Sequence, residues 1–219
     1  KPQGVITLEF PHLMRLVESR QFDTVYHEHF SYFSLLTVRR IFEKADLRVF
    51  DVEELPTHGG SLRLYGCRKE AKYLETTSVA SLLAEETRRG MNALNYYATL
   101  QAHADLVKSD LMAFLHRQKK LGNTVVGYGA AAKGNTLINY AGITSELLSE
   151  VSDSAPSKQG HFLPGSHIPI VSPESIKKIQ PEYVLILPWN LAEEIRNQLK
   201  YIRKWGGQFV SAIPKLEIN

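Results

Sequence analysis

Residues 125–136 read VVGYGAAAKGNT, and they give the clearest indication of the fold class. Its β-branched start predicts a short strand, its glycines predict a turn, and a helix is expected from about Asn135 to Tyr140. A strand that passes through a glycine turn into a helix begins a βαβ unit, the building block of parallel sheets. Such a helix start presents free backbone N–H groups and a positive helix end, which attract phosphate.

The chain on both sides of this stretch alternates between strands and helices, which predicts a parallel-sheet domain over residues 121–219. Residues 183–187, YVLIL, are fully apolar, as is typical of a strand buried between two helix layers. Ser172 and Pro173 are suited to the start of a helix, and Gly206-Gly207 to the end of one. The other strands are expected at 124–127, 148–153, 168–171 and 208–213, and the last helix at 191–205.

The first part of the chain, residues 1–75, also mixes strands and helices. Strands are expected at 5–10, 47–55 and 61–68, the last two joined by a turn-rich connection, and helices at 12–19 and, capped by Ser34, at 35–45. Apolar residues at three- and four-residue spacing then predict a connecting helical segment over 76–120, either one helix or two with a break near Gly90. The fold class expected is α/β with two domains.

Composition excludes several classes of protein. The chain has 219 residues, 43% hydrophobic and 22% charged, which is ordinary for a globular protein, and its net charge of +3 demands neither nucleic acid nor a membrane surface. The single cysteine, Cys67, fits a structural thiol in a reducing compartment better than a nucleophile. No apolar run is long enough to span a bilayer, so we expect a cytoplasmic protein. Because the chain opens on Lys1, we expect a fragment with partner sequence upstream.

The densest group of reactive side chains is YHEH at residues 26–29. A helical zinc site needs histidines four apart, and His27 and His29 are two apart, so a zinc site is not expected. The remaining alternatives are a polar loop and a general base. Imidazole suits a base because its reference pKa of about 6.5 leaves the neutral form abundant at pH 7, and a neighbouring carboxylate such as that of Glu28 can orient it.

Two glycine-containing stretches are further candidates. Residues 58–63, HGGSLR, would form either a plain hairpin turn or a turn whose amides face a bound anion or carbonyl. The turn after the strand at 124–127 has one residue more than the dinucleotide fingerprint, and Lys133 is not followed by Ser or Thr as in a P-loop. Two roles for this turn stay open: contact with a diphosphate or sugar through Lys133, and simple packing of the strand against the helix. Asp153 would hold a ribose or cap a loop.

Four stretches, in this order, resemble the C-terminal half of the S-adenosylmethionine-dependent sugar C-methyltransferases, which methylate a carbon of a nucleotide-linked deoxy-keto sugar. They are FDTVYHEHFSY at 22–32, HGGSLR at 58–63, GYGAAAKGN at 127–135 and YVLILPWN at 183–190. The resemblance implies that residues 1–75 end the cofactor-binding methyltransferase sheet and that 121–219 form a Rossmann-like C-terminal domain. It also implies a glycine-rich S-adenosylmethionine loop and a zinc-binding region, both upstream of this chain.

The resemblance also implies roles for single residues. His29 would be the base that removes a proton beside the ketone, and Tyr26 and Glu28 would orient this base or bind the sugar and the developing enolate. The residues implied to contact the nucleotide sugar are His58, Gly59, Gly60, Ser61, Gly127, Gly129, Lys133 and Asn135. No metal site and no nucleic-acid partner are expected in this chain.

Two other classes of function remain open at this point. The chain is alternatively a non-catalytic nucleotide-sugar binding module, or a scaffold for a catalytic half outside it. The hypothesis of an NAD-linked oxidoreductase is supported only by the turn at Gly127 and by Asp153. The sugar, the nucleotide base, the methylated carbon, the stereochemistry and the oligomeric state are not encoded in any pattern of the sequence.

Overall fold

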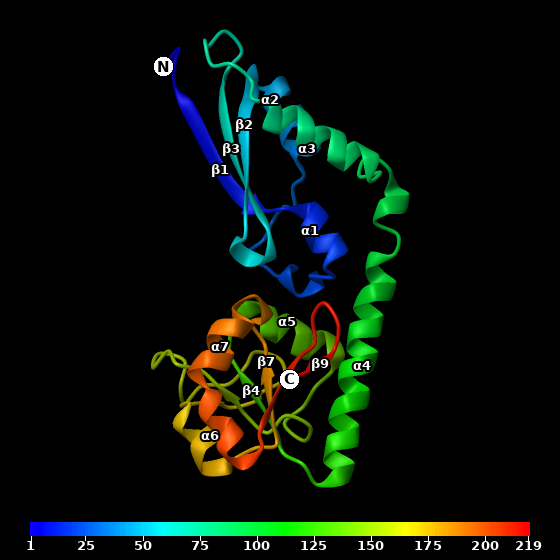
Figure 1. Ribbon diagram of the computed structural model, residues 1–219, viewed down its shortest axis with the longest axis vertical. Helices are drawn as coiled ribbons and strands as arrows, with labels where there is room; N and C mark the ends of the chain where they lie inside the picture. The colour runs from blue at the N-terminus through cyan, green and yellow to red at the C-terminus, as the bar shows by residue number, and fades with distance from the viewer. The chain divides into compact units, whose positions relative to one another are not determined.

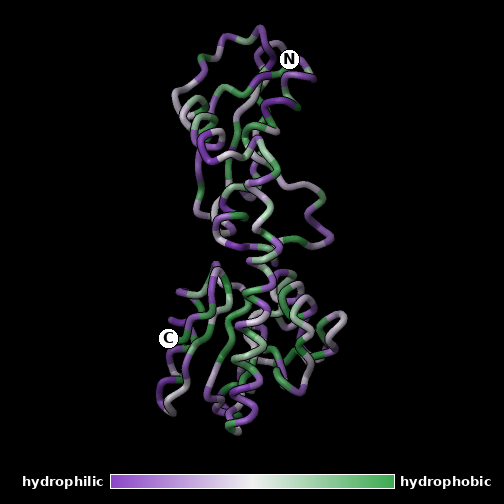
Figure 2. Tube along the Cα trace, turned by 90° about the vertical axis from the view of Figure 1, so that its right-hand side faces the viewer, coloured by the Kyte–Doolittle hydropathy of each residue, from purple (hydrophilic) through white to green (hydrophobic).

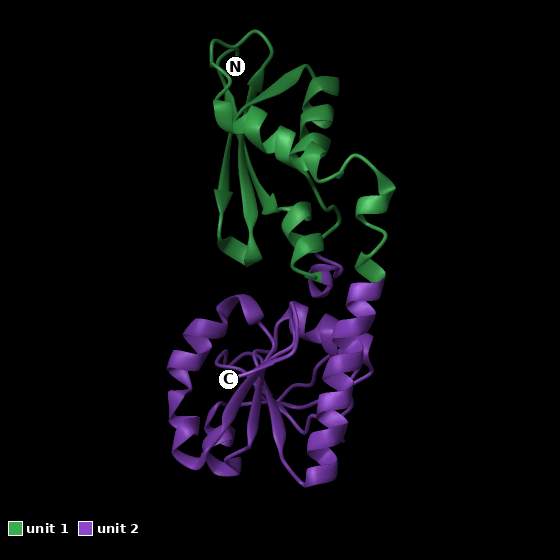
Figure 3. Ribbon diagram, turned by 45° about the vertical axis from the view of Figure 1, so that its right-hand side comes forward, with its two compact units in different colours: residues 1–21, 29–101 green, residues 22–28, 102–219 purple.

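The computed structural model describes residues 1–219 and divides them into two compact units (Figure 3). Unit 1 comprises residues 1–21 and 29–101, and unit 2 comprises residues 22–28 and 102–219. The short segment 22–28 is therefore separated in sequence from the rest of the unit to which it belongs.

Unit 1 is built on a three-stranded antiparallel sheet of order β1-β3-β2 (Figure 1). The expected hairpin is confirmed, because β2 and β3 pair antiparallel on either side of a short turn. The elements of this unit are β1 (Val5–Pro11), α1 (Leu13–Glu18), α2 (Leu35–Lys44), β2 (Leu47–Leu55), η2 (Thr57–Gly59), β3 (Ser61–Arg68), α3 (Thr77–Arg88) and η3 (Leu94–Tyr96).

Helices α2 and α3 pack on this sheet and close its core. Leu35, Val38 and Phe42 of α2 are buried together with Leu62 and Leu64 of β3. The cap expected at Ser34 is present, since its Oγ accepts from the backbone N–H of Thr37 at 3.1 Å. Cys67 is fully buried in β3, as a structural thiol is.

Unit 2 contains a six-stranded sheet of order β6-β5-β4-β7-β8-β9, parallel except for β9. The α/β class and its parallel sheet are thus confirmed. Its elements are η1 (Phe22–Thr24), α4 (Leu100–Leu121), β4 (Val125–Tyr128), α5 (Ala132–Ala141), β5 (Val151–Ser152), β6 (Ile170–Val171), α6 (Glu174–Ile179), β7 (Tyr183–Ile186), η4 (Trp189–Leu191), α7 (Ala192–Gln198), η5 (Lys200–Trp205), β8 (Gln208–Ser211) and β9 (Glu217–Ile218).

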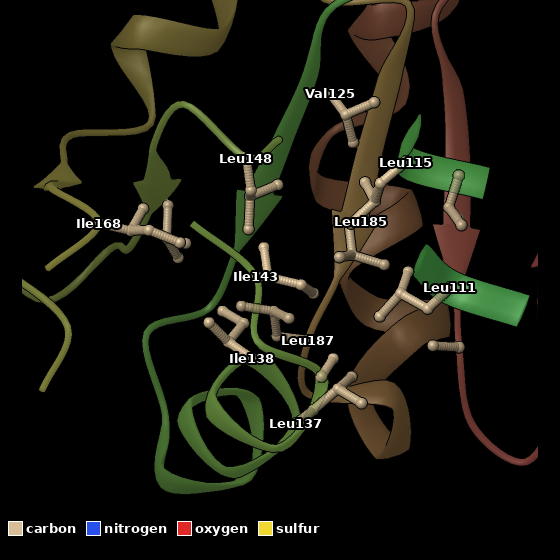
Figure 4. Close-up of a cluster of buried hydrophobic side chains, with 14 of the residues drawn as sticks. Leu111, Leu115, Val125, Leu137, Ile138, Ile143, Leu148, Ile168, Leu185 and Leu187 are labelled. Atoms are coloured by element: carbon tan, nitrogen blue, oxygen red, sulfur yellow. The ribbon is translucent and has the colours of Figure 1, made fainter. Parts of the chain in front are cut away.

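Helices cover both faces of this parallel sheet, and successive strand residues point to opposite faces. Val125 and Leu185 lie in one core with α4 and α5 (Figure 4), and Val126 and Val184 lie in another with α6, α7 and η5. The trace of these strands is largely in the hydrophobic colour (Figure 2), as strands buried on both faces require. No helix is both long and apolar enough to cross a membrane.

Several expected elements differ in length from those observed. The strands expected at 168–171 and 208–213 are Ile170–Val171 and Gln208–Ser211, and the helix expected from about Asn135 already begins at Ala132. For the segment 76–120, the alternative of two helices with a break near Gly90 is confirmed, since α3 ends at Arg88 and α4 begins at Leu100. The strand expected at 148–153 is only Val151–Ser152, because the N–H of Leu148 still bonds to Thr144 in the preceding turn. The last expected helix is interrupted at Leu199, where α7 gives way to the 3₁₀ helix η5.

Candidate functional site

The YHEH motif is divided between the two units. Tyr26, His27 and Glu28 belong to unit 2, whereas His29 belongs to unit 1. No group of three or more His, Cys, Asp or Glu side chains in the structure could hold a metal ion. The two halves of the motif are therefore described with the unit that carries each.

In unit 1, His29 lines a hollow of about 210 Å³ at one end of the sheet. The side chains around it come from two of the predicted motifs and from β1, and they are Glu9, Phe10, Pro11, His29, His58 and Ser61. Pro11 and Ser61 face each other across the β1–β3 pair, which places the HGGS turn beside the end of β1. The structure thus brings His29 together with His58 and Ser61.

The HGGS turn has backbone angles that a plain type I turn does not use. His58, Gly59 and Gly60 all have positive φ, at 56°, 87° and 117°. At Gly60 a Cβ atom would stand 2.7 Å from Cγ of Arg15, so both the φ value and the close approach of α1 require glycine. A positive φ at a residue other than glycine, as at His58, is uncommon and concentrates at functional sites.

Hydrogen bonds from α1 and its flanks hold this turn in place. The Gln21 side-chain Nε2 donates to the carbonyl of Gly59 at 2.9 Å, and the backbone N–H of His12 donates to the carbonyl of Gly60 at 3.0 Å. Within the turn, Ser61 Oγ donates to the carbonyl of Thr57 at 3.0 Å. The turn that presents His58 is therefore fixed from both sides.

Glu9 is a site residue that the sequence analysis did not identify. Its carboxylate accepts from Arg63, at 2.8 Å from Nη2 and 3.1 Å from Nε, and from Thr57 Oγ1 at 3.4 Å. The only signal in the sequence is a carboxylate within the strand-like run VITLEF. Its place beside His29 and His58 depends on strand register, which the pattern does not give.

In unit 2, Asp23 anchors the segment that carries Tyr26 and Glu28. Asp23 is buried, and its Oδ2 accepts from the indole Nε1 of Trp189 at 2.8 Å. Burial raises the pKa of Asp23 to about 6, although the Trp189 hydrogen bond and the charge of Lys133 both act to lower it. Phe22 next to it packs its ring on Tyr140, with centroids 5.0 Å apart.

Lys133 lies in the same cluster and not on the surface. Its Nζ is 3.2 Å from Oδ1 of Asn190 and 4.5 Å from the centre of the Trp189 ring. Burial lowers the pKa of this ammonium, and the nearby Asp23 opposes that shift. β4 and β7 end here, where the chain order of the parallel sheet reverses, the place at which α/β sheets bind ligands.

Unit 2 has a cavity of its own, of about 260 Å³, which opens beside the start of α5. It is lined by Tyr26, His27, Ala130, Ala131, Ala132, Asn135, Thr136, Lys158, Leu163, Pro164 and Ile170. The side-chain Oδ1 of Asn135 is buried there and has no hydrogen-bond partner. An unpaired amide oxygen next to a cavity can accept a hydrogen bond from a ligand hydroxyl or amide.

The glycines of this unit and Asp153 have structural roles. A Cβ atom on Gly127 would meet Val151 at 2.8 Å, and one on Gly129, whose φ is 92°, would meet Pro188 at 2.5 Å. The Asp153 carboxylate accepts from the backbone N–H groups of Ala130 at 2.7 Å and Ala155 at 2.8 Å. These contacts support a loop cap and leave little of the carboxylate for a ribose.

Comparisons with known proteins support the resemblance to the C-methyltransferases. A family model described as the C-methyltransferase C-terminal domain matches residues 56–214. The C-methyltransferase NovU of Streptomyces niveus is 38% identical over 214 residues, which cover 98% of this chain and 51% of that protein. The chain thus spans about half the length of this relative. The chain belongs to the C-methyltransferase family and contains its C-terminal domain.

Proposed function

We propose that this chain is the C-terminal portion of an S-adenosylmethionine-dependent C-methyltransferase that acts on a nucleotide-linked deoxy-keto sugar, with His29 as the general base. One observation carries the proposal: His29 and His58, from separate motifs, line one hollow in unit 1. Membership of the C-methyltransferase family supplies the reaction class. We further propose that the protein works in the cytoplasm.

The chemistry assigned to this chain is removal of a proton from carbon. A hydrogen beside a ketone is acidic because the electron pair left on carbon delocalises onto the carbonyl oxygen as an enolate. An imidazole nitrogen of His29 takes this proton, and the enolate carbon then acts as the nucleophile toward a methyl group. His58, Gly59, Gly60 and Ser61 would close over the sugar, where N–H groups can stabilise the negative oxygen.

The remaining candidate residues are proposed to bind or orient. Tyr26 and Glu28 would orient the base or hydrogen-bond the sugar. Asn135 would offer its unpaired Oδ1 to the nucleotide portion. Lys133 would contribute its positive charge from its buried position, and Gly127 and Gly129 would shape the turn that precedes α5.

The hollow around His29 is small. Its volume of about 210 Å³ is below the roughly 300 Å³ of the smaller ligand pockets. We assign no residue of this chain to S-adenosylmethionine, which supplies a methyl group from its sulfonium when bound. We also assign no residue of this chain to the zinc that the family resemblance implies.

The test is methyl transfer by the full-length enzyme with His29→Ala. We expect no methyl transfer in a single turnover and nucleotide-sugar affinity within a few fold of wild type, because the base is lost and the binding surface is kept. His116→Ala, an exposed histidine of α4, serves as the matched control and should transfer methyl normally. A wild-type single-turnover rate in His29→Ala would rule out His29 as the base.

The second candidate function is a nucleotide-sugar binding module without chemistry. The cavity beside α5, with the unpaired Oδ1 of Asn135, favours it because the cavity lies entirely within unit 2. Titration calorimetry of this chain with a nucleotide sugar measures that affinity directly. Binding without any His29-dependent chemistry in the full-length protein would favour the module, and absence of binding would exclude it.

A further inference from the structure

His12 stands where three parts of unit 1 meet. Its backbone N–H donates to the carbonyl of Gly60 at 3.0 Å, and the N–H of the next residue, Leu13, donates to the carbonyl of Phe33 at 2.9 Å. His12 and Phe33 also form a parallel β-bridge. The backbone that follows β1 is thus tied both to the HGGS turn and to the segment that continues from His29.

The side chain of His12 is paired with Glu86 of α3. His12 is 1% exposed and Glu86 is 0% exposed, and 2.8 Å separates Nε2 of the imidazole from Oε1 of the carboxylate. The two side chains thus share one hydrogen bond between Nε2 and Oε1. The other ring nitrogen, Nδ1, is buried without a partner, which leaves the contact with Glu86 as the one hydrogen bond of the ring.

Glu86 in turn holds the start of α2. Its Oε1 accepts from the N–H of Leu35 at 2.7 Å, and its Oε2 accepts from the N–H of Leu36 at 2.8 Å. These are the first two residues of α2, whose free N–H groups favour a negative charge. The helix begins only two residues after Phe33, so the pair fixes the end of the segment that carries His29.

A buried pair of this kind is weak evidence of a role in stability. Two buried ionisable side chains lose their hydration, and apolar residues of similar volume often give equal or greater stability. What a satisfied polar contact adds is a single geometry, since its donor and acceptors must meet at set distances. His12 and Glu86 therefore act where the geometry of both motifs must be held.

We infer that His12 and Glu86 are positioning residues that set how His29 and His58 face each other across the hollow of unit 1. The backbone leads from His58 to Gly60, whose carbonyl accepts from the N–H of His12, and from His29 to Phe33, which pairs with His12 in a β-bridge and accepts from the N–H of Leu13. This inference rests on the proposed role of His29. Neither His12 nor Glu86 lines the hollow, so both act through the backbone and not on the substrate.

The first test uses steady-state kinetics of the full-length enzyme. His12→Leu keeps a side chain of similar volume and removes the imidazole that bonds to Glu86. Glu86→Gln replaces one carboxylate oxygen, which accepts hydrogen bonds, by an NH₂ group, which donates them. Each is expected to lower kcat at least tenfold while KM for the nucleotide sugar stays within about threefold. His12→Gln, whose amide can still donate to Glu86, should recover most of kcat, and Glu85→Gln, the neighbouring glutamate that pairs with Arg88 and Arg89, should match wild type.

The second test uses this chain and needs no activity. In NMR spectra of the folded variants, the imidazole Cε1–H resonances of His29 and His58 should move in His12→Leu and Glu86→Gln and stay in place in Glu85→Gln. Unmoved resonances with wild-type kcat would overturn the inference, as would loss of folding in both His12→Leu and Glu86→Gln, because the pair would then be structural only. If the wild-type enzyme transfers no methyl group to a nucleotide ketosugar, the proposed function is wrong. The NMR result would still show whether His12 and Glu86 position His29 and His58.

Discussion

Trp189 and Asp23, 166 residues apart in the chain, are joined by a hydrogen bond of 2.8 Å from the indole Nε1 to the carboxylate Oδ2. This contact attaches the segment 22–28 to the end of β7 in unit 2. Three of the four residues of the YHEH motif follow Asp23 on that segment. A carboxylate outside the motif therefore helps to hold the segment of Tyr26 and Glu28 on unit 2.

Burial of Asp23 predicts a pH-dependent stability of unit 2. Its pKa is raised from 3.8 to about 6, so the folded state binds this proton more tightly than the unfolded state does. The stabilisation is fully present below about pH 4 and is lost as pH rises through 6, an effect on the order of 3 kcal/mol. Asp23→Asn should gain unfolding free energy relative to wild type between pH 4 and pH 7.

Urea unfolding followed by tryptophan fluorescence measures this change, because Trp189 and Trp205 both lie in unit 2. Trp205→Phe in both backgrounds leaves Trp189 as the single reporter. A difference between Asp23→Asn and wild type that is the same at pH 4 and pH 7 would contradict the account.

Gly60→Ala is expected to destabilise unit 1. The added Cβ would lie 2.7 Å from Cγ of Arg15, and φ at this residue is 117°. Strain of this kind costs about 1–3 kcal/mol. Gly90→Ala is the matched control, since Gly90 also has a positive φ, of 85°, but its Cβ would meet nothing within 4 Å.

Thermal unfolding followed by circular dichroism compares the two alanine variants. The melting temperature should fall further for Gly60→Ala than for Gly90→Ala, and the difference reports the contact with Arg15. Equal losses would mean that α1 moves away from the HGGS turn at no cost.

Asp153→Asn is expected to loosen the turn between β4 and α5. It weakens hydrogen bonds to the N–H groups of Ala130 and Ala155 and removes the charge opposite Lys158, for a loss of about 1–3 kcal/mol. Lys158→Gln removes only the ion pair, whose lysine is 42% exposed, and should cost less than about 1 kcal/mol. Urea unfolding of the two variants checks this order, and a larger loss for Lys158→Gln would refute it.

Much of the fold was predictable from local sequence patterns. The apolar run at 183–187 indicates a strand buried on both faces, and Ser34 marks the start of α2, because both signals depend only on neighbouring residues. The HGGS turn was predictable as a connection between two strands for the same reason. The length of β5 was not predictable from the sequence, because Leu148 is buried like a strand residue although it lies in a turn.

The site was less predictable, because its members meet through long-range contacts. The division of the YHEH motif after Glu28 follows from long-range contacts of the segment 22–28 with unit 2, among them the bond between Trp189 and Asp23, which no local pattern encodes. Glu9 reaches the hollow of His29 through the register of β1 on β3. The pairing of His12 with Glu86 joins residues 74 apart, and neither residue stands in a recognisable motif.

The step proposed for His29 is removal of a proton from the carbon beside the ketone. Deuterium uptake at that carbon, measured by mass spectrometry in D₂O with nucleotide ketosugar and without methyl donor, isolates this step in the full-length enzyme. Wild type and His116→Ala should take up deuterium, and His29→Ala should show none above the uncatalysed rate. Uptake by His29→Ala at the wild-type rate would show that another group is the base.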